Sequence, residues 1–150
     1  MQSNYIYIIS PKMNQTDIQA LKDFFLHDEF ARQNGIEIVE IAEGYARTQV
    51  SIEPRHLNAG GYVQGGLLFT LADLAFAAAT NSHGTLTVTS TANITFVRGA
   101  SKGIITAQAQ ELVNHHHLPF CEVRVTDEAG NLLAIFTANG YRKEGIPSVS

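Results

Sequence analysis

One stretch of the sequence restricts the possible folds more than any other. Residues 65–79 read GGLLFTLADLAFAAA, in which Thr70 and Asp73 are the only polar side chains. The run is shorter than the roughly 18–20 apolar residues that a membrane-spanning helix needs, and it contains a carboxylate. A globular chain has to bury such a run. We therefore expect a core helix over about residues 66–81, with Gly84 signalling its C-terminal end.

The expected helix has two different faces when it is drawn on a wheel of about 100° per residue. One face is large and aliphatic and suits packing on a sheet; it carries Leu67, Leu68, Leu71, Ala75 and Ala78. The other face is small and mildly polar; around Asp73 it carries Gly66, Thr70, Ala77 and Thr80, flanked by Phe69 and Phe76. The second face is of a kind that lets another surface or a ligand approach closely.

Asp73 leaves two interpretations open. An ionised carboxylate buried without partners costs several kcal/mol, so it is either satisfied by hydrogen bonds or used in chemistry. A structural aspartate would bond to the backbone or to Thr70 one turn away. A functional interpretation gains from the helix start, because Gly65 and Gly66 expose unpaired N–H groups that a ligand atom can reach without meeting a side chain.

The segment before this helix predicts a helix and a hairpin. Residues 14–33 have Asn14 or Thr16 as N-cap candidates. They also carry an apolar stripe at helical spacing, made of Ile18, Leu21, Phe24, Phe25 and Phe30. Residues 36–42 and 45–53 alternate apolar and polar side chains around Glu43-Gly44, which is typical of two paired strands.

Four more strands are expected after the apolar helix, at residues 85–98, 103–113, 120–127 and 132–142. In the first of them, period-2 alternation puts Thr85, Thr87, Thr89, Thr91 and Thr95 on one face and Leu86, Val88, Ala92, Ile94 and Phe96 on the other. The short links between the four strands favour a meander whose apolar face the helix covers.

Composition indicates one domain over residues 1–150, with residues 1–13 as an N-terminal extension and 143–150 as a frayed tail. The net charge of −4 argues against nucleic acid or an anionic membrane surface as the main partner. A single cysteine excludes an internal disulfide, and the first residues lack the features of a signal peptide. We expect a soluble cytoplasmic protein.

The stretch HLNAGGYVQGGLLFTLADLAFAAA resembles the hotdog-fold acyl-CoA thioesterases of the phenylacetate-degradation, or PaaI-like, type. Their pattern is approximately H-x-N-x-x-G-x-x-H-G-G followed by L-x-x-L-x-D-x-A. The residues that fall on it in register are His56, Asn58, Gly61, Gly65, Gly66, Leu71, Asp73 and Ala75. The resemblance covers about residues 35–142. It implies an α+β hotdog fold, in which a long antiparallel sheet wraps around one central apolar helix, here with an extra N-terminal helix.

The resemblance also implies an activity and a two-subunit site. The activity is hydrolysis of an acyl-CoA thioester by a homodimer, paired again into a homotetramer, without a metal or redox cofactor, the coenzyme A moiety being part of the substrate. By the same resemblance, Asp73 of the facing subunit would be the nucleophile or the general base. Gly65, or the adjacent amide of Gly66, would be the oxyanion donor, and Asn58 would orient the carbonyl or the attacking water.

One position departs from the family pattern, because Gln64 replaces the histidine of H-G-G. Glutamine donates hydrogen bonds but carries no proton at neutral pH, which disfavours an acyl-thioester hydratase. A non-catalytic acyl-CoA binding or sensing protein is the alternative from another class. Gln64, Thr70 and His56 are assigned to substrate binding with Gly66, although His56 could equally be structural.

Other candidate residues carry weaker signals. Arg98 and Lys102, and also Arg142, could meet the phosphates of coenzyme A or remain solvated at strand ends. Within NHHHLPF, His115 and His117 could face one metal, but no Cys or carboxylate accompanies them, so no metal site is predicted. Cys121 is expected to be a buried thiol rather than a nucleophile.

Overall fold

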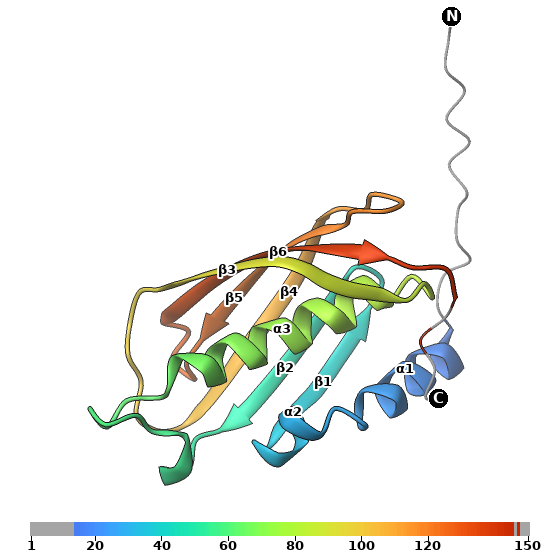
Figure 1. Ribbon diagram of the computed structural model, residues 1–150. Helices are drawn as coiled ribbons and strands as arrows, with labels where there is room; N and C mark the ends of the chain where they lie inside the picture. The colour runs from blue at the N-terminus through green and yellow to red at the C-terminus, as the bar shows by residue number, and fades with distance from the viewer. Residues whose placement is uncertain (1–13, 146, 148–150) are drawn as a thin grey trace, which may run out of the picture.

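The computed structural model describes residues 14–145 and 147, so the expected N-terminal extension, residues 1–13, lies outside the described residues. Six antiparallel strands form one curved sheet, and the long helix α3 (Gly65–Asn81) lies along one face of it (Figure 1). The helices α1 (Gln15–Phe25) and α2 (Glu29–Gln33) lie beside the strand β1 (Ile36–Ala42). This is the architecture that the resemblance implies. Among the described residues, no helix is long and apolar enough to cross a bilayer.

The single N-terminal helix expected over residues 14–33 is two helices. Asn14 begins α1 as predicted, since its side chain accepts from the N–H of Asp17 and the Asp17 side chain accepts from Asn14. The helix ends at Phe25 because Asp28 caps a second helix, accepting from the N–H of Ala31 at 3.0 Å. The chain changes direction there. Phe30, expected on the buried stripe, is consequently 65% exposed.

The hairpin before α3 agrees with the sequence. Strand β1 pairs with β2 (Tyr45–Ser51), and Gly44 in the turn has a φ of 68°, a conformation that favours glycine. The second strand ends at Ser51 rather than residue 53, because Pro54 opens a short 3₁₀ turn, η1 (Pro54–His56). This turn leads into the loop that precedes α3.

The expected meander of four strands is wrong for the first of them. The strands after α3 are β3 (Thr87–Phe96), β4 (Ile104–Val113), β5 (Phe120–Thr126) and β6 (Leu132–Arg142). The order across the sheet is β1-β2-β4-β5-β6-β3, so β3 pairs with β6 and not with β4. The link from residue 97 to 103 is long enough for this crossing, since seven extended residues span roughly 23 Å and three strand spacings need about 14 Å.

A β-bulge in β3 reverses part of the face assignment made from its alternation. The pairing with β6 shifts between Thr89 and Thr91, so one extra residue enters the strand there. Thr87 and Thr89 therefore face α3, on the same side as Ile94 and Phe96, and Val88 is exposed. The sequence pattern had placed these threonines on the opposite face.

Helix α3 forms the core of the molecule with its aliphatic face. All five residues predicted on that face are buried: Leu67, Leu68, Leu71, Ala75 and Ala78. On the small face, Phe69, Thr70, Asp73 and Ala77 are only partly buried, while Gly66 is exposed. Thr80 and Phe76, expected on or beside this face, are fully buried because the sheet closes over the C-terminal half of α3. A partly open, narrow strip of α3 therefore surrounds Asp73.

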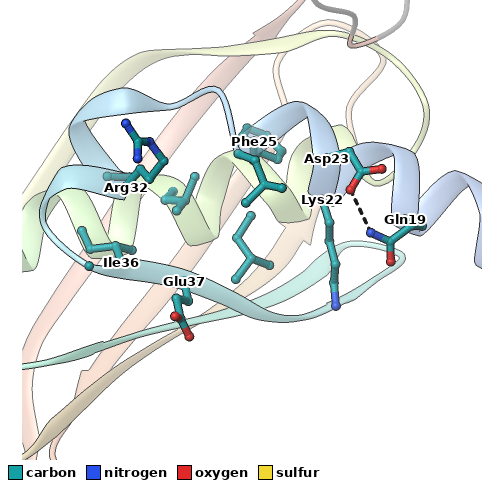
Figure 2. Close-up of a pocket in the computed structure, with 12 residues that line it drawn as sticks. Gln19, Lys22, Asp23, Phe25, Arg32, Ile36 and Glu37 are labelled. Carbon is teal, nitrogen blue, oxygen red and sulfur yellow. Dashed lines mark hydrogen bonds between the residues drawn. The ribbon is translucent and has the colours of Figure 1, made fainter.

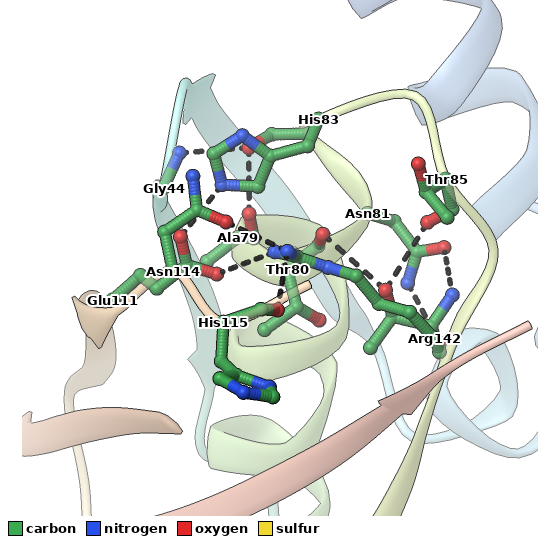
Figure 3. Close-up of polar contacts among 12 residues, drawn as sticks. Gly44, Ala79, Thr80, Asn81, His83, Thr85, Glu111, Asn114, His115 and Arg142 are labelled. Carbon is green, nitrogen blue, oxygen red and sulfur yellow. Dashed lines mark hydrogen bonds and ion pairs between the residues drawn. The ribbon is translucent and has the colours of Figure 1, made fainter. Parts of the chain in front are cut away.

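A buried ionic cluster fastens the C-terminal end of α3 to the sheet (Figure 3). Glu111 on β4 accepts from Arg142 on β6 at 3.1 Å and contacts His83, just after α3, at 2.6 Å. Arg142 also donates to Asn114 and to the carbonyl oxygen of His115, both at 2.7 Å. The cluster joins three segments that are distant in the sequence. Beyond it, Lys143 and Gly145 still exchange backbone hydrogen bonds with Leu86.

The Glu111→Gln variant is expected to lose about 1.5–3 kcal/mol of unfolding free energy, because an amide does not balance the buried charge of Arg142. Urea denaturation at pH 7 measures the difference. Glu122→Gln is the matched control, since Glu122 pairs with Arg124 at the surface, where an ion pair contributes about 0–1 kcal/mol. Equal losses in the two variants would contradict the structural role of the cluster.

Candidate active site

A pocket of about 450 Å³ opens at the N-terminus of α3. It lies between the loop before α3 and the segment that follows β3. Its lining residues are Asn58, Tyr62, Val63, Gly65, Leu68, Phe96, Val97, Arg98, Gly99 and Ala100. Three of the residues that the sequence singled out, Asn58, Gly65 and Arg98, thus meet in one pocket.

The loop before α3 is organised by the side chain of Asn58. Its Oδ1 accepts from the N–H of Gly60 at 2.9 Å and from the N–H of Tyr62 at 3.2 Å. Two backbone donors fix the orientation of the amide, because only its oxygen can face them. The NH₂ group of Asn58 is left as a donor at the pocket.

The first turn of α3 presents one free donor. Gln64 is the N-cap of the helix, and its Oε1 accepts from the N–H of Gly66. The N–H of Leu67 bonds to the carbonyl of Gln64. Within the part of the chain that the structure describes, the N–H of Gly65 has no acceptor. Of the two glycine amides, only that of Gly65 is therefore available to a ligand atom, and only Gly65 lines the pocket.

A side chain at position 65 would crowd the ring of Phe96. A Cβ at this position would lie 2.9 Å from Cζ of Phe96, because the ring of Phe96 covers the helix start. Phe96 is 52% exposed in the single chain, as is Tyr62 at 55%. The pocket mouth is thus bordered by two open aromatic side chains.

Asp73 lies two turns further along α3 and outside this pocket. Its Oδ1 accepts from the hydroxyl of Thr89 on β3 at 2.8 Å. The structural interpretation with Thr70 as partner is wrong, since the Thr70 hydroxyl donates to the carbonyl of Gly66. Burial raises the pKa of Asp73, the hydrogen bond from Thr89 lowers it, and the negative charge of Asp28 raises it further. Asp73 is a carboxylate with one neutral donor and no cationic partner among the described residues.

The remaining predicted residues lie in different places. His56 is buried beneath the loop, where its Nδ1 accepts from the N–H of Glu53 at 3.0 Å and its Nε2 has no partner among the described residues. Lys102 is exposed and does not line the pocket. Thr89 was not identified from the sequence as a site residue. The β-bulge that turns it toward Asp73 cannot be recognised from the alternation of polar and apolar residues in this strand.

The other weak candidates have structural surroundings. His115 Nδ1 accepts from the N–H groups of His117 and Leu118 and so closes the turn after β4. No cluster of three or more His, Cys, Asp or Glu side chains with a metal-binding arrangement occurs in the described ranges. Cys121 is buried as predicted, and burial raises the pKa of its thiol to about 12, so the reactive thiolate is absent at neutral pH.

A second pocket of about 430 Å³ lies between the N-terminal helices and β1 (Figure 2). Phe25, Ile36 and Leu74 contribute apolar surface, with Lys22 and Arg32 also in the lining. None of the residues predicted for the site lines it. The pocket at the start of α3 is therefore the one that gathers the candidate chemistry.

Comparison with known proteins gives a consistent result. The family model of the thioesterase superfamily matches residues 60–134, which is half of the chain. A protein of Archaeoglobus fulgidus is 33% identical over 89% of this chain and 88% of its own. Acyl-coenzyme A thioesterase PaaI of Escherichia coli is 32% identical over 79% of this chain and 86% of its own.

Solved structures agree. The Escherichia coli PaaI protein from the phenylacetic acid degradation operon superposes with a TM-score of 0.82 at 29% identity, over 85% of this chain and 94% of that one. This chain is thus similar to the PaaI protein in both sequence and structure over most of its length. The chain therefore belongs to the thioesterase superfamily, has the hotdog fold of the PaaI type, and is an enzyme of the thioester hydrolase class.

Proposed function

We propose that this chain hydrolyses an acyl-CoA thioester to a free acid and coenzyme A. Two features of one helix support the proposal. The N–H of Gly65 is free, and Asp73 is a partly exposed carboxylate that has no cationic partner among the described residues. The substrate class follows the name of the Escherichia coli relative, an acyl-coenzyme A thioesterase. Water, a carboxylate and backbone N–H groups supply the chemistry, so no metal or redox cofactor is needed.

The site we propose is shared by two copies of the chain. Eight residues of helix separate Gly65 from Asp73, a rise of about 12 Å, so a single chain does not bring both to one carbonyl. The strand β3 is an edge of the sheet, and Val88 and Phe96 on it are exposed. A second copy that pairs antiparallel along β3 would place its Asp73 opposite the Gly65 of the first. The further pairing of dimers into a tetramer, which the resemblance implies, uses other surfaces.

Each residue has a defined part in the proposed reaction. The N–H of Gly65 donates to the thioester oxygen, and the NH₂ of Asn58 orients the carbonyl or the attacking water. As general base, Asp73 takes a proton from water, the water oxygen attacks the carbonyl carbon, and Gly65 stabilises the oxyanion. The intermediate then expels the thiolate of coenzyme A, which takes up the proton. As nucleophile, Asp73 would instead attack the carbonyl carbon and expel the thiolate of coenzyme A; water would then hydrolyse the resulting anhydride to the free acid and regenerate the Asp73 carboxylate.

Arg98 is the proposed contact for the phosphate groups of coenzyme A, because it lines the pocket, whereas Lys102 lies outside the lining. Its guanidinium has no ion-pair partner among the described residues and suits a phosphate. The single buried cysteine fits a reducing compartment, and we assign the enzyme to the cytoplasm.

The experiment that tests the proposal is thiol release from a panel of aryl- and fatty-acyl-CoA thioesters, with binding of each measured in parallel by calorimetry. We expect release of free coenzyme A from at least one thioester in catalytic turnover. Binding without release would instead support the alternative of an acyl-CoA binding protein. An absence of both would contradict the proposed substrate class.

The Thr89→Val variant tests the environment of Asp73. Activity requires the ionised carboxylate, so kcat/KM falls as the pH drops through the pKa of Asp73. Burial already raises that pKa, and loss of the Thr89 hydroxyl removes a contact that lowers it. The acidic limb of the pH profile is therefore expected to move to higher pH in Thr89→Val and to remain in place in Thr89→Ser. An unshifted limb in the valine variant would show that Asp73 is not the titrating group.

A further inference from the structure

The first turn of α3 begins with two flexible residues and needs additional contacts to be held in one conformation. Gly65 and Gly66 are consecutive in its first turn. Glycine loses more conformational freedom on ordering than any other residue, so two of them form a loose helix start. An N–H that has to stabilise an oxyanion needs a fixed direction. Another residue has to hold this turn in place.

Gln64 makes the contacts that hold it. Its N–H donates to the carbonyl of His56 at 2.9 Å, and its carbonyl accepts from Leu67 at 3.0 Å. Its side-chain Oε1 folds over the first turn and accepts from the N–H of Gly66. One residue thus joins the loop to the helix and caps the helix.

Gly66 permits this contact. A Cβ on Gly66 would lie 2.7 Å from Oε1 of Gln64, which is closer than real Cβ contacts. Only glycine leaves room for the amide of Gln64 to fold back. The cap therefore depends on both residues, and neither of them lines the pocket that contains Gly65.

We infer that Gln64 is a positioning residue, which caps the N–H of Gly66 and thereby aims the neighbouring N–H of Gly65 at the thioester oxygen without touching the substrate. The inference rests on the proposed function. Gln64 and Gly66 together form the cap of the helix, and Gly65 is the oxyanion donor. The glutamine thus has a role that needs no proton transfer.

The variants Gln64→Ala and Gln64→Ser separate this role from the others. Both remove the amide, but the serine hydroxyl still caps a helix start, whereas alanine does not. With a thioester that wild type hydrolyses, Gln64→Ala is expected to lower kcat by about tenfold or more, because a misaimed donor is worth little. KM should change less than kcat, and Gln64→Ser should recover at least about a third of the wild-type kcat.

Three results would overturn the inference. Equal losses in the serine and alanine variants would mean that the amide itself contacts the substrate. A loss confined to KM would mean a binding role. An unchanged kcat with a lower melting temperature in Gln64→Ala, measured where both proteins are folded, would mean that the cap only stabilises the helix.

A second set of variants tests the pairing of Gln64 with Gly66. Gly66→Ala would displace the amide of Gln64, so it should lower kcat as Gln64→Ala does, and the double variant should be no slower than either single one. Multiplied losses would contradict the shared role. If wild type released no thiol, the proposed function would fail before this inference is reached. If wild type is active and the variants behave otherwise, only the inference fails.

Discussion

The Asp73→Asn variant is expected to lose about 10²- to 10⁴-fold in kcat, the range that a general base contributes, because asparagine neither accepts a proton from water nor attacks a thioester. Substrate affinity should change little. Thiol release under single-turnover conditions measures the loss, and Asp23→Asn, an exposed aspartate on α1, is the matched control. A rate within threefold of wild type would remove Asp73 from the mechanism.

Although Asp73→Asn is expected to lower activity, we do not expect it to lower the stability of the fold. Burial raises the folded-state pKa of Asp73 above the ordinary value of 3.8. The folded state therefore binds the proton more tightly than the unfolded state, and stability falls as the pH rises through the folded-state pKa. At neutral pH, Asp73→Asn is expected to melt at the same temperature as wild type or higher. A lower melting temperature would indicate that Asp73 has a mainly structural role.

The Gly65→Ala variant keeps the backbone N–H but is expected to displace it, with a loss in kcat that approaches the roughly 10²–10³-fold effect of removing one oxyanion donor. The added methyl group would lie 2.9 Å from Cζ of Phe96, so the helix start or the ring has to move. The proposed pairing of two copies along β3 would cover Phe96 and hold its ring, so we expect the helix start to move and to misplace the N–H of Gly65. Steady-state kinetics with a thioester that wild type hydrolyses measures the effect.

Gly99→Ala is a suitable comparison for Gly65→Ala. It also directs a methyl group at an aromatic ring of the same pocket, 2.8 Å from Cδ1 of Tyr62, but its N–H has no part in the mechanism. We expect its effect mainly in KM, since Tyr62 is exposed and can turn away. If both variants lost only affinity, Gly65 would be a wall of the pocket rather than an oxyanion donor.

Local patterns in the sequence predicted most of the elements because each has a local cause. The apolar run of α3 has too few polar groups for any place but the core, and Gly44 and Gly84 mark turns by their positive φ. The division of the N-terminal helix at Asp28 also has a local cause, a second N-cap. It was missed because the apolar stripe continues through it to Phe30.

The sheet order and the bulge could not be predicted in the same way. The pairing of β3 with β6 rather than with β4 depends on how the sheet curves around α3. No residue in the link between β3 and β4 indicates that the two strands lie apart in the sheet. The bulge after Thr89 adds one residue without a glycine or proline to mark it. Because side chains alternate, this single residue turns Thr89 toward Asp73.

The candidate site was predictable to different degrees. Gly65, Asn58 and Arg98 gather in one pocket because the loop, the helix start and the end of β3 converge there. The exclusive availability of the Gly65 amide depends on where the side chain of Gln64 folds, which spacing does not reveal. The donor to Asp73 comes from a strand sixteen residues further along the chain.

The central claim is that one active site combines Gly65 of one chain with Asp73 of its partner. Subunit complementation tests it directly: the inactive Asp73→Asn and Gly65→Ala chains are co-expressed with different tags, and mixed dimers are isolated. Each mixed dimer would hold one intact site and one doubly altered site, so about half of the wild-type rate per dimer is expected. Mixed dimers no more active than either parent variant would contradict a shared site.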